Sequence, residues 1–413
     1  MTIPTINAFI NFSTGPSAAQ ALILDQGILG TNILADSASV IVDVSDVVNS
    51  ITTRRGRSAQ TDQFQTGDLT LVIVDENGNF NPQNSSGPYF ELLTPMRKVV
   101  ITATYGAVTY PIFSGFITSF STSIPTKGIG DVAYTTIKAV DAFRLAQNAQ
   151  ISTVSGTSAG QLSGARINNL LDAISWPNSM RDVDAGLTTV QADPSTQRTA
   201  LAAMQTIETT EFGSLYVDAS GSFVFQDRFV TTASIAGTPT VFNDDGAGIK
   251  YFNAVWVLND LLVFNQANVT ATGLATQTAT DAASVDKYFL HSYNQQNLLM
   301  QDTATALNYA QAFVASRAET SIRCDAIELD LYTADYNDGI IAALDLDYFD
   351  PITVTTAQPG GTTLTKTLQV FGKGMTITPN SWRVVLTTLE AIIDGFILNN
   401  ANYGVLDTNV LSY

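Results

Sequence analysis

Ile101-Thr-Ala-Thr-Tyr-Gly106 begins a series of three β-prone stretches in the first third of the chain. The second stretch is Phe113-Ser-Gly115-Phe-Ile117, and the third is Tyr134-Thr-Thr-Ile-Lys-Ala-Val140-Asp141-Ala142. β-Branched and aromatic residues separated by glycine and polar loops are typical of strands joined by turns. The series therefore predicts a strand, a glycine turn, a strand with a Phe-x-Gly motif, a polar loop, and a strand that ends in an apolar residue, an acid and alanine.

The last part of the chain follows the same order. It contains Ile352-Thr-Val-Thr-Thr356, a Gly360-Gly361 turn, Phe371-Gly-Lys-Gly374-Met375, and Trp382-Arg-Val-Val-Leu-Thr-Thr-Leu389-Glu390-Ala391. A β-unit present twice in one chain would let three chains form a ring with six similar positions. The alternative is that a β-rich protein contains look-alike hairpins without duplication, and the residues alone leave both interpretations open.

The composition limits the possible functions. Of the 413 residues, 45% are hydrophobic and only 14% are charged, which indicates a sizeable core and two or three domains. The formal net charge of −18 disfavours a protein that grips nucleic-acid phosphates. An acidic surface can still face DNA by repelling it, as the wall of a channel would.

The remaining compositional signals concern cysteine and hydrophobic runs. Cys324 is the only cysteine, so one chain cannot form a disulfide or a multi-cysteine metal site. The N-terminus lacks a basic region followed by an apolar core, so we expect no secretory signal. No apolar run reaches membrane-spanning length.

The middle of the chain changes from strand patterns to helix patterns. Apolar residues at helical spacing predict helices over residues 163–174 and 195–209, and a hairpin over residues 213–226 follows them. The best helix pattern lies later, over the Ala-rich residues 301–317. We therefore expect an N-terminal β-rich domain, an α/β insertion and a second β domain, and their bounds are residues 1–150, 151–235 and 236–413.

Residues that could carry chemistry are few. His291 is the only histidine, which cannot supply a multi-histidine metal site, and Cys324 lacks a nearby base. Asp75, Asn77 and Asn79 alternate as in a calcium loop, but the glycine and bidentate glutamate of such a loop are missing. We expect turn chemistry there, and no catalytic residue, metal or cofactor.

Two charged clusters have competing interpretations. Asp345, Asp347 and Asp350 could form a glycosidase pair, but the chain has only three tryptophans to build a sugar cleft, so a solvated turn is favoured. The arginines at 54, 55 and 57 form the densest basic cluster of an acidic chain. They either bind an acidic neighbouring subunit or simply lie at a solvated strand end.

Residues 54–120 combine several motifs in a fixed order. They are Arg55-Gly56-Arg57, Phe64-x-x-Gly67, Asp75-x-x-Gly78-x-Phe80-Asn81-Pro82, Arg97-Lys-Val-Val-Ile101 and Phe113-Ser-Gly115. This combination resembles the minor tail proteins of long-tailed bacteriophages. Residues 211–228 and 265–317 are similar to the same family, so the resemblance covers most of the chain.

The resemblance implies a fold and a role. The fold is mainly β, with two tail-tube-like β-barrel domains, an α/β insertion between them, and a homotrimer that forms a pseudo-sixfold ring. The role is that of a baseplate hub at the virion's tail tip, made in the host bacterial cytoplasm, without enzymatic activity, adapting the sixfold tail tube to a threefold tip and lining the DNA exit channel. The candidate subunit-interface residues are Arg54, Arg55, Arg57, Phe113, Gly115, Phe371 and Gly374.

The same resemblance implies partners and leaves alternatives. The expected partners are the distal tail protein, the tape measure protein and the tip or fibre proteins of the same tail. Phage DNA would pass through the lumen without specific binding, and the host envelope would be met indirectly. The alternatives are a hexameric distal tail ring protein, with one barrel per chain, and a receptor-binding or glycan-cleaving tail protein.

Overall fold

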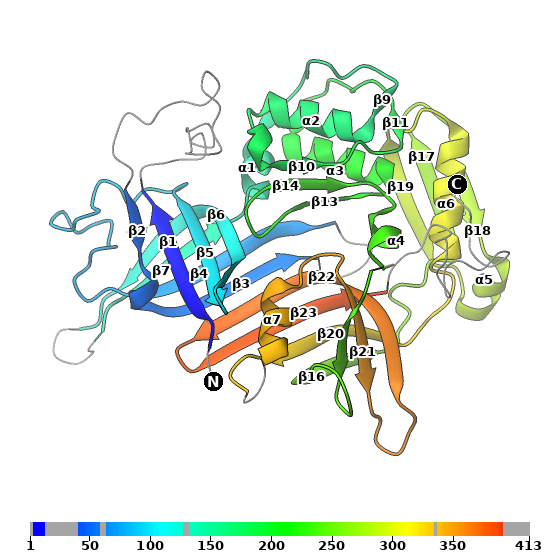
Figure 1. Ribbon diagram of the computed structural model, residues 1–413. Helices are drawn as coiled ribbons and strands as arrows, with labels where there is room; N and C mark the ends of the chain where they lie inside the picture. Colours follow the sequence, from blue (N-terminus) through cyan, green and yellow to red (C-terminus); the bar gives the residue numbers. More distant parts are fainter. Residues whose placement is uncertain are drawn as a thin grey trace.

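The fold is dominated by one large sheet, shown in the computed structural model of Figure 1. The structure describes residues 3–12, 40–57, 63–126, 132–235, 237–333 and 337–390. Within these residues, thirteen strands pair into one sheet. Its N-terminal half contains β1 (Thr5–Asn11), β2 (Ile41–Asp43), β3 (Val48–Gly56), β4 (Gln65–Val74), β5 (Lys98–Tyr105), β6 (Val108–Ser123) and β7 (Tyr134–Val140). Its C-terminal half contains β15 (Thr240–Asn243), β16 (Asn253–Val257), β20 (Arg323–Asp330), β21 (Pro351–Thr356), β22 (Leu364–Thr378) and β23 (Ser381–Leu389).

The two halves have the same strand order. The N-terminal half runs β3-β4-β7-β6-β5-β1, and the C-terminal half runs β16-β20-β23-β22-β21-β15. The halves differ in their last pair, because β1 is antiparallel to β5 whereas β15 is parallel to β21. The repeat therefore extends beyond the hairpins that the sequence suggested, and duplication is the better interpretation of the two.

The long strands β6 and β22 carry the same irregularity. Pairing with the following strand slips between Ile117 and Ser119 in β6, and between Val370 and Gly372 in β22. Both strands have a run of six buried residues at this bulge: residues 112–117 end directly before it in β6, and residues 368–373 include it in β22. A bulge inserts one extra residue and re-aims the strand, so a shared bulge fixes how the two strands correspond. Ile117 corresponds to Val370, and Ser119 to Gly372.

Backbone bonds to the loop before β5 and β21 give the same correspondence. The N–H of Met96 donates to the oxygen of Ile117 at 2.6 Å, and the N–H of Phe349 donates to the oxygen of Val370 at 2.7 Å. Met96 and Phe349 both adopt the left-handed region, with φ of 67° and 68°. Non-glycine residues rarely adopt this conformation, so its occurrence at both positions supports the duplication.

The structure corrects the alignment of Phe113-Ser-Gly115 with Phe371-Gly-Lys-Gly374. With the bulges superposed, Phe371 corresponds to Thr118 and not to Phe113. Phe371 is the extra residue of its bulge, whereas Phe113 pairs with Ile101 in the β5–β6 ladder. The two motifs have similar sequences, but their structural positions differ by five residues. The sequence does not reveal this offset, because a bulge changes the position of a side chain without a characteristic residue type.

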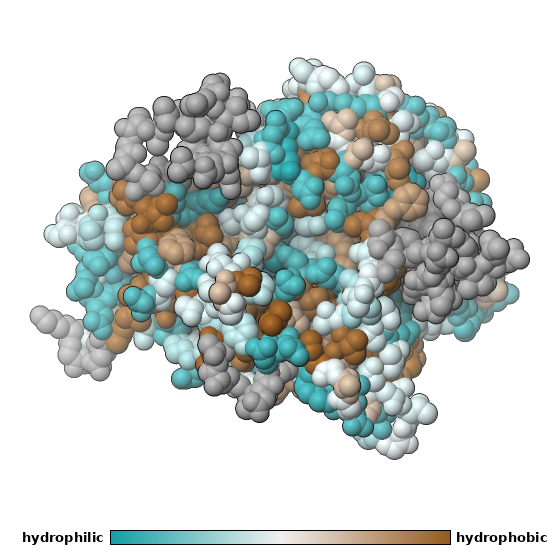
Figure 2. Space-filling model, viewed as in Figure 1, coloured by the Kyte–Doolittle hydropathy of each residue, from teal (hydrophilic) through white to brown (hydrophobic). Residues whose placement is uncertain are grey.

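The sheet is open in the part of the chain that the structure describes. Its path ends at β16 on one side and at β2 on the other, so the pairings do not close either half into the barrel that was predicted. The two halves share a core in which alternate residues of each strand are buried, as in β5 and β23. Figure 2 shows hydrophilic residues interspersed with several separate apolar patches on the face viewed, one of them over the N-terminal strands at the left.

An α/β unit covers the junction of the halves. Helices α1 (Phe143–Asn148), α2 (Ser163–Ala173) and α3 (Ala200–Glu211) pack with a small sheet of β10 (Arg181–Val183), β14 (Phe223–Gln226) and β13 (Ser214–Val217). Short ladders pair β8 (Gln150–Ile151) with β12 (Arg198–Thr199) and β9 (Gln161–Leu162) with β11 (Thr189–Val190), and α4 (Val230–Ile235) follows. The predicted helices over 163–174 and 195–209 are confirmed as α2 and α3. Helix α3 begins later than predicted because the Thr199 side chain caps it, accepting from the N–H of Ala202 at 3.1 Å.

A second small unit lies at the right of Figure 1. Its sheet has the order β18-β17-β19, and α6 (Thr303–Ala315) packs on it around a separate core. Its other elements are β17 (Gln266–Ala271), β18 (Gln277–Thr280), α5 (Ala282–Tyr288) and β19 (Ser292–Leu298). Helix α6 confirms the helix predicted over 301–317, and Asp302 caps it by accepting from the N–H of Thr305 at 2.7 Å. The last helix, α7 (Asn337–Asp345), connects β20 to β21. No helix of the described residues is both long and apolar enough to cross a membrane.

Candidate functional site at the junction of the two halves

The two halves meet where β3 pairs with β22. This antiparallel ladder runs from Gly56 opposite Gly372 to Ile51 opposite Ile377. Gly56 has φ of 105°, and a Cβ at this position would lie 2.3 Å from the oxygen of Phe371. Only glycine fits such a close approach of two backbones, so Gly56 sets how tightly the halves join.

An ion pair between a buried arginine and a partly exposed aspartate crosses this junction. The Nη2 atom of Arg55 lies 3.1 Å from the carboxylate of Asp347, and the guanidinium lies 5.2 Å from the ring centre of Tyr348. Burial alone would lower the pKa of Arg55, but the charge and hydrogen bond of Asp347, together with Tyr348 and Asp218, outweigh it, so the pKa lies above its ordinary value. Removing one partner of such a pair leaves an uncompensated charge. Arg55 and Asp347 therefore lock the end of β3 to the loop before β21.

Lys373 forms a second polar lock in the C-terminal half. Its buried Nζ donates to the oxygens of Leu344 at 2.9 Å and Leu346 at 2.7 Å, at the C-terminal end of α7. Burial lowers the pKa of Lys373 to about 8, although the charge of Asp347 acts in the opposite direction. A cation at this end of a helix satisfies carbonyl oxygens that have no partner within the helix.

Aromatic rings connect the junction to the α/β unit. The guanidinium of Arg57 lies 4.9 Å from the ring centre of Phe64 and 4.2 Å from that of Phe371. The ring of Phe64 lies 5.1 Å from that of Tyr216 in β13 and 4.9 Å from that of Tyr348. Stacking of this kind stabilises a contact beyond the area it buries. The N-terminal half, the C-terminal half and the α/β unit thus meet in one cluster.

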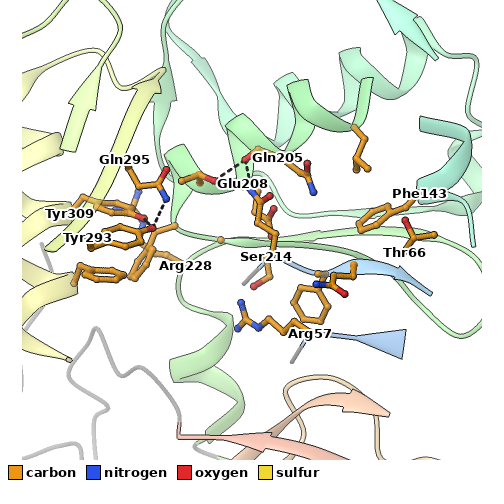
Figure 3. A pocket seen from close by; sticks show the side chains of 18 of the residues that line it. Arg57, Thr66, Phe143, Gln205, Glu208, Ser214, Arg228, Tyr293, Gln295 and Tyr309 are labelled. Atoms are coloured by element: carbon orange, nitrogen blue, oxygen red, sulfur yellow. Dashed lines mark hydrogen bonds between the residues drawn. The ribbon is translucent and has the colours of Figure 1, made fainter. Parts of the chain in front are cut away.

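A cavity of about 720 Å³ opens beside this cluster (Figure 3). It is lined by the end of β3, by α3 and β13, and by Tyr293, Gln295 and Tyr309 of the second small unit. Buried Glu208 faces it from α3: its Oε1 accepts from the N–H of Leu215 at 2.9 Å, and its Oε2 has no hydrogen-bond partner among the described residues. Burial raises the pKa of Glu208 to about 7.

The predicted interface residues lie mostly inside the chain. Arg55, Phe113, Gly115 and Phe371 are buried, Arg57 and Gly374 are half-buried, and Arg54 is exposed. Contacts within the chain account for the burial of these four, and their assignment to a subunit interface stays a prediction. Arg54 stands between Gly374 and Asp68 in the adjacent strands, and its role at a subunit interface stays a prediction. An acidic partner was predicted for the arginines, and Arg55 has one in its own chain, Asp347.

Two of the three clustered aspartates hold a turn. Asp347 pairs with Arg55, and the Oδ2 of Asp350 accepts from the N–H of Asp347 at 2.8 Å. The turn is more buried than predicted, because Asp350 and Asp347 are both only partly exposed. Sequence reasoning did not find the partnership of Arg55 with Asp347, since the two are 292 residues apart and no local pattern joins them.

The other candidate residues have structural surroundings. Asp75 accepts from the N–H of Asn79 at 2.7 Å and from that of Phe80 at 3.1 Å, as turn chemistry predicts. Cys324 is buried, which raises the pKa of its thiol to about 11. The single histidine, His291, places its Nε2 3.2 Å from the oxygen of Tyr288. Within the described ranges, no group of three or more histidines, cysteines or acids could hold a metal ion.

Comparison with known proteins gives matches in structure only. The sequence matches no protein-family model and no curated protein. Among solved structures, the 43 kDa tail protein of prophage MuSo2 from Shewanella oneidensis is similar with a TM-score of 0.55 and 13% identity, over 86% of this chain and 98% of that one. The tail protein from Neisseria meningitidis MC58 is similar with a TM-score of 0.56 and 10% identity, over 95% of this chain and 98% of that one. At these identities the likeness shows the fold, and the resemblance to tail proteins is confirmed at that level.

Proposed function

We propose that this chain is a structural protein of a bacteriophage tail tip, a baseplate hub, and that it has no enzymatic activity. The observation that carries the proposal is the repeated strand order of the two halves, joined side by side through β3 and β22. The shared fold with two tail proteins along nearly their whole length supports the same class of function.

The repeat suits a ring that changes symmetry. Three chains with two similar halves each present six similar positions, so one ring can match a sixfold tube on one side and a threefold tip on the other. Gly56 and the Arg55–Asp347 pair join the two halves and fix the angle between them. A fixed angle is what a ring needs to close at a defined number of subunits.

The proposed partners follow from this position in a tail. They are the distal tail protein above the ring, the tape measure protein and the tip or fibre proteins, with the host envelope met indirectly. Phage DNA would pass through the lumen without specific binding, since the net charge of −18 disfavours retention of phosphates. The chain would reach the virion's tail tip after synthesis in the host cytoplasm.

The stoichiometry of the purified chain tests the proposal. Light scattering at high and low concentration should give a trimer, and electron microscopy of that trimer should show six similar lobes around a channel. A hexamer would favour the distal tail ring, which needs only one such half per chain. A monomer at every concentration, together with cleavage of host-wall sugars, would favour the receptor-binding or glycan-cleaving alternative.

A further inference from the structure

Each half has a strand edge that is open within the described residues, in addition to the edge of β2 at the end of the sheet path. In the C-terminal half, β16 pairs with β20 on one side only. In the N-terminal half, β5 accompanies β6 only as far as Phe116, so residues 119–123 of β6 pair with β7 on one side only. Open edges present unpaired N–H and C=O groups, and natural proteins usually cover them.

The duplication identifies what covers these edges. The equivalent of residues 119–124 in the C-terminal half is the segment of β22 from Gly372 to Ile377, and there the edge is covered by β3. The equivalent of β3 is β16, since each stands first in the strand order of its half. The contact β3–β22 inside the chain therefore has a missing counterpart, a contact between β16 and β6.

We propose that β16 of one copy pairs, antiparallel, with residues 119–124 of the next copy, which are the end of β6 and the residue directly after it. The inference rests on the proposed trimer and names the surface that closes it. Each copy offers one edge of each kind, so the contact is head-to-tail, and three copies close a ring in which junctions within chains alternate with junctions between chains.

The ladders also give the register. Thr52 lies opposite Thr70 in β4, and Val255 lies opposite Ala326 in β20. Thr70 pairs with Lys138 in β7, which pairs with Ser119, the residue after the bulge in β6. Ala326 pairs with Thr387 in β23, which pairs with Gly372, the residue after the bulge in β22. Thr70 and Ala326 therefore occupy equivalent positions. Val255 is therefore the counterpart of Thr52.

The partner of Thr52 across the junction is Thr376, whose counterpart in β6 is Ser123. The expected register between copies places Val255 opposite Ser123 and Ala254 opposite Ile124.

The exposure of apolar side chains agrees with this register. Ile124 is 69% exposed, whereas its counterpart Ile377, covered by β3, is 6% exposed. Val255 in the open edge is 44% exposed. Pairing with a second copy would cover Ile124 and the backbone groups, whereas Val255 would stay on the open face, as its exposed counterpart Thr52 does.

Cysteine cross-linking tests the register. The double variant Ser123→Cys with Val255→Cys, treated with a short bis-maleimide, should give covalent dimers and trimers on a denaturing gel. The control is Ile41→Cys with Val255→Cys, which tests pairing of β16 with β2, the opposite end of the sheet path, where Ile41 is 58% exposed. We expect at least tenfold more cross-linked product from the first variant. Cys324 is buried and should not react.

Light scattering on the same untreated samples separates the two proposals. A trimer whose cross-links form in the Ser123→Cys double variant supports both. A trimer without that product, or with product only from the Ile41→Cys control, overturns the strand pairing and leaves the trimer standing. A monomer at every concentration that gives no product overturns the pairing and the trimer together.

Discussion

Replacing Glu208 with glutamine should stabilise the protein at alkaline pH. The Oε1 of glutamine can still accept from the N–H of Leu215, which lies 2.9 Å from Oε1 of Glu208. The amide nitrogen would replace Oε2, which has no partner among the described residues in any case. The substitution therefore keeps the shape and the hydrogen bond of the neutral acid, and removes only the ability to ionise.

The sign and size follow from the pKa of Glu208. Burial raises it from 4.5 to about 7, so between these values the folded state holds a proton that the unfolded state releases. The contribution of Glu208 to stability is complete below pH 4.5 and is lost as the pH rises through 7. At about 1.4 kcal/mol per pKa unit, glutamine should raise the free energy of unfolding by about 3 kcal/mol at pH 8, and by about 1 kcal/mol at pH 5.5.

Unfolding in urea at these two pH values, followed by the fluorescence of Trp176 in the α/β core, measures the effect. The matched control is Glu211→Gln, one turn further along the same helix. Glu211 is ion-paired with Arg228 at 3.2 Å and accepts from the Oγ of Ser163 at 2.6 Å, so its neutral replacement should destabilise at both pH values. A gain for Glu208→Gln that is equal at pH 5.5 and 8, or a loss comparable to that of Glu211→Gln, would refute the reasoning.

Three further substitutions probe the junction and the open edge. Gly56→Ala should cost at least about 3 kcal/mol in urea unfolding, because the methyl group meets the opposite backbone; Gly106→Ala, where nothing lies within 4 Å of the added Cβ, should cost much less. Asp347→Asn should lower the free energy of unfolding by about 2 kcal/mol, because Arg55 is left buried without its counter-charge. The double variant with Arg55→Met should regain most of this stability, which a double-mutant cycle measures. Ile124→Lys should leave the unfolding transition unchanged and lower the trimer's association constant at least tenfold in sedimentation equilibrium; an unchanged constant would place the interface elsewhere.

The sequence was sufficient for the repeated hairpins and for the three longer helices. Both rest on local signals, namely β-branched residues between glycine turns and apolar residues at helical spacing. It was not sufficient for register, because the bulges at Thr118 and Phe371 have no signature in residue type, and the motif alignment slipped by five residues. A one-residue change of register reverses which face is buried, so matching letters do not guarantee matching positions.

The partners of the junction were beyond the sequence for a different reason. The sequence identifies Arg55 as part of a basic cluster, but Asp347 lies 292 residues away along the chain. Only the pairing of β3 with β22 brings Arg55 and Asp347 together. The same limit applies to residues 266–298, whose strand patterns indicate that one face is buried but not that they form a separate sheet under α6. Alternation identifies a buried face without identifying what buries it.

The two kinds of junction differ in chemistry in a way that suits their order of formation. The junction within the chain contains two buried cations, Arg55 and Lys373, and each would be costly if it were left without its partners. It must therefore form as the chain folds. In the edge of β6 the counterpart of Lys373 is Phe120, which is half-buried and uncharged, and the nearby Ile124 is apolar. Backbone groups and apolar side chains at such an edge can be exposed in a folded chain, and their burial against a second copy then stabilises the complex. Introducing a charge at position 124, which is exposed, should therefore harm assembly more than folding, whereas removing the charge at position 373 should harm folding first.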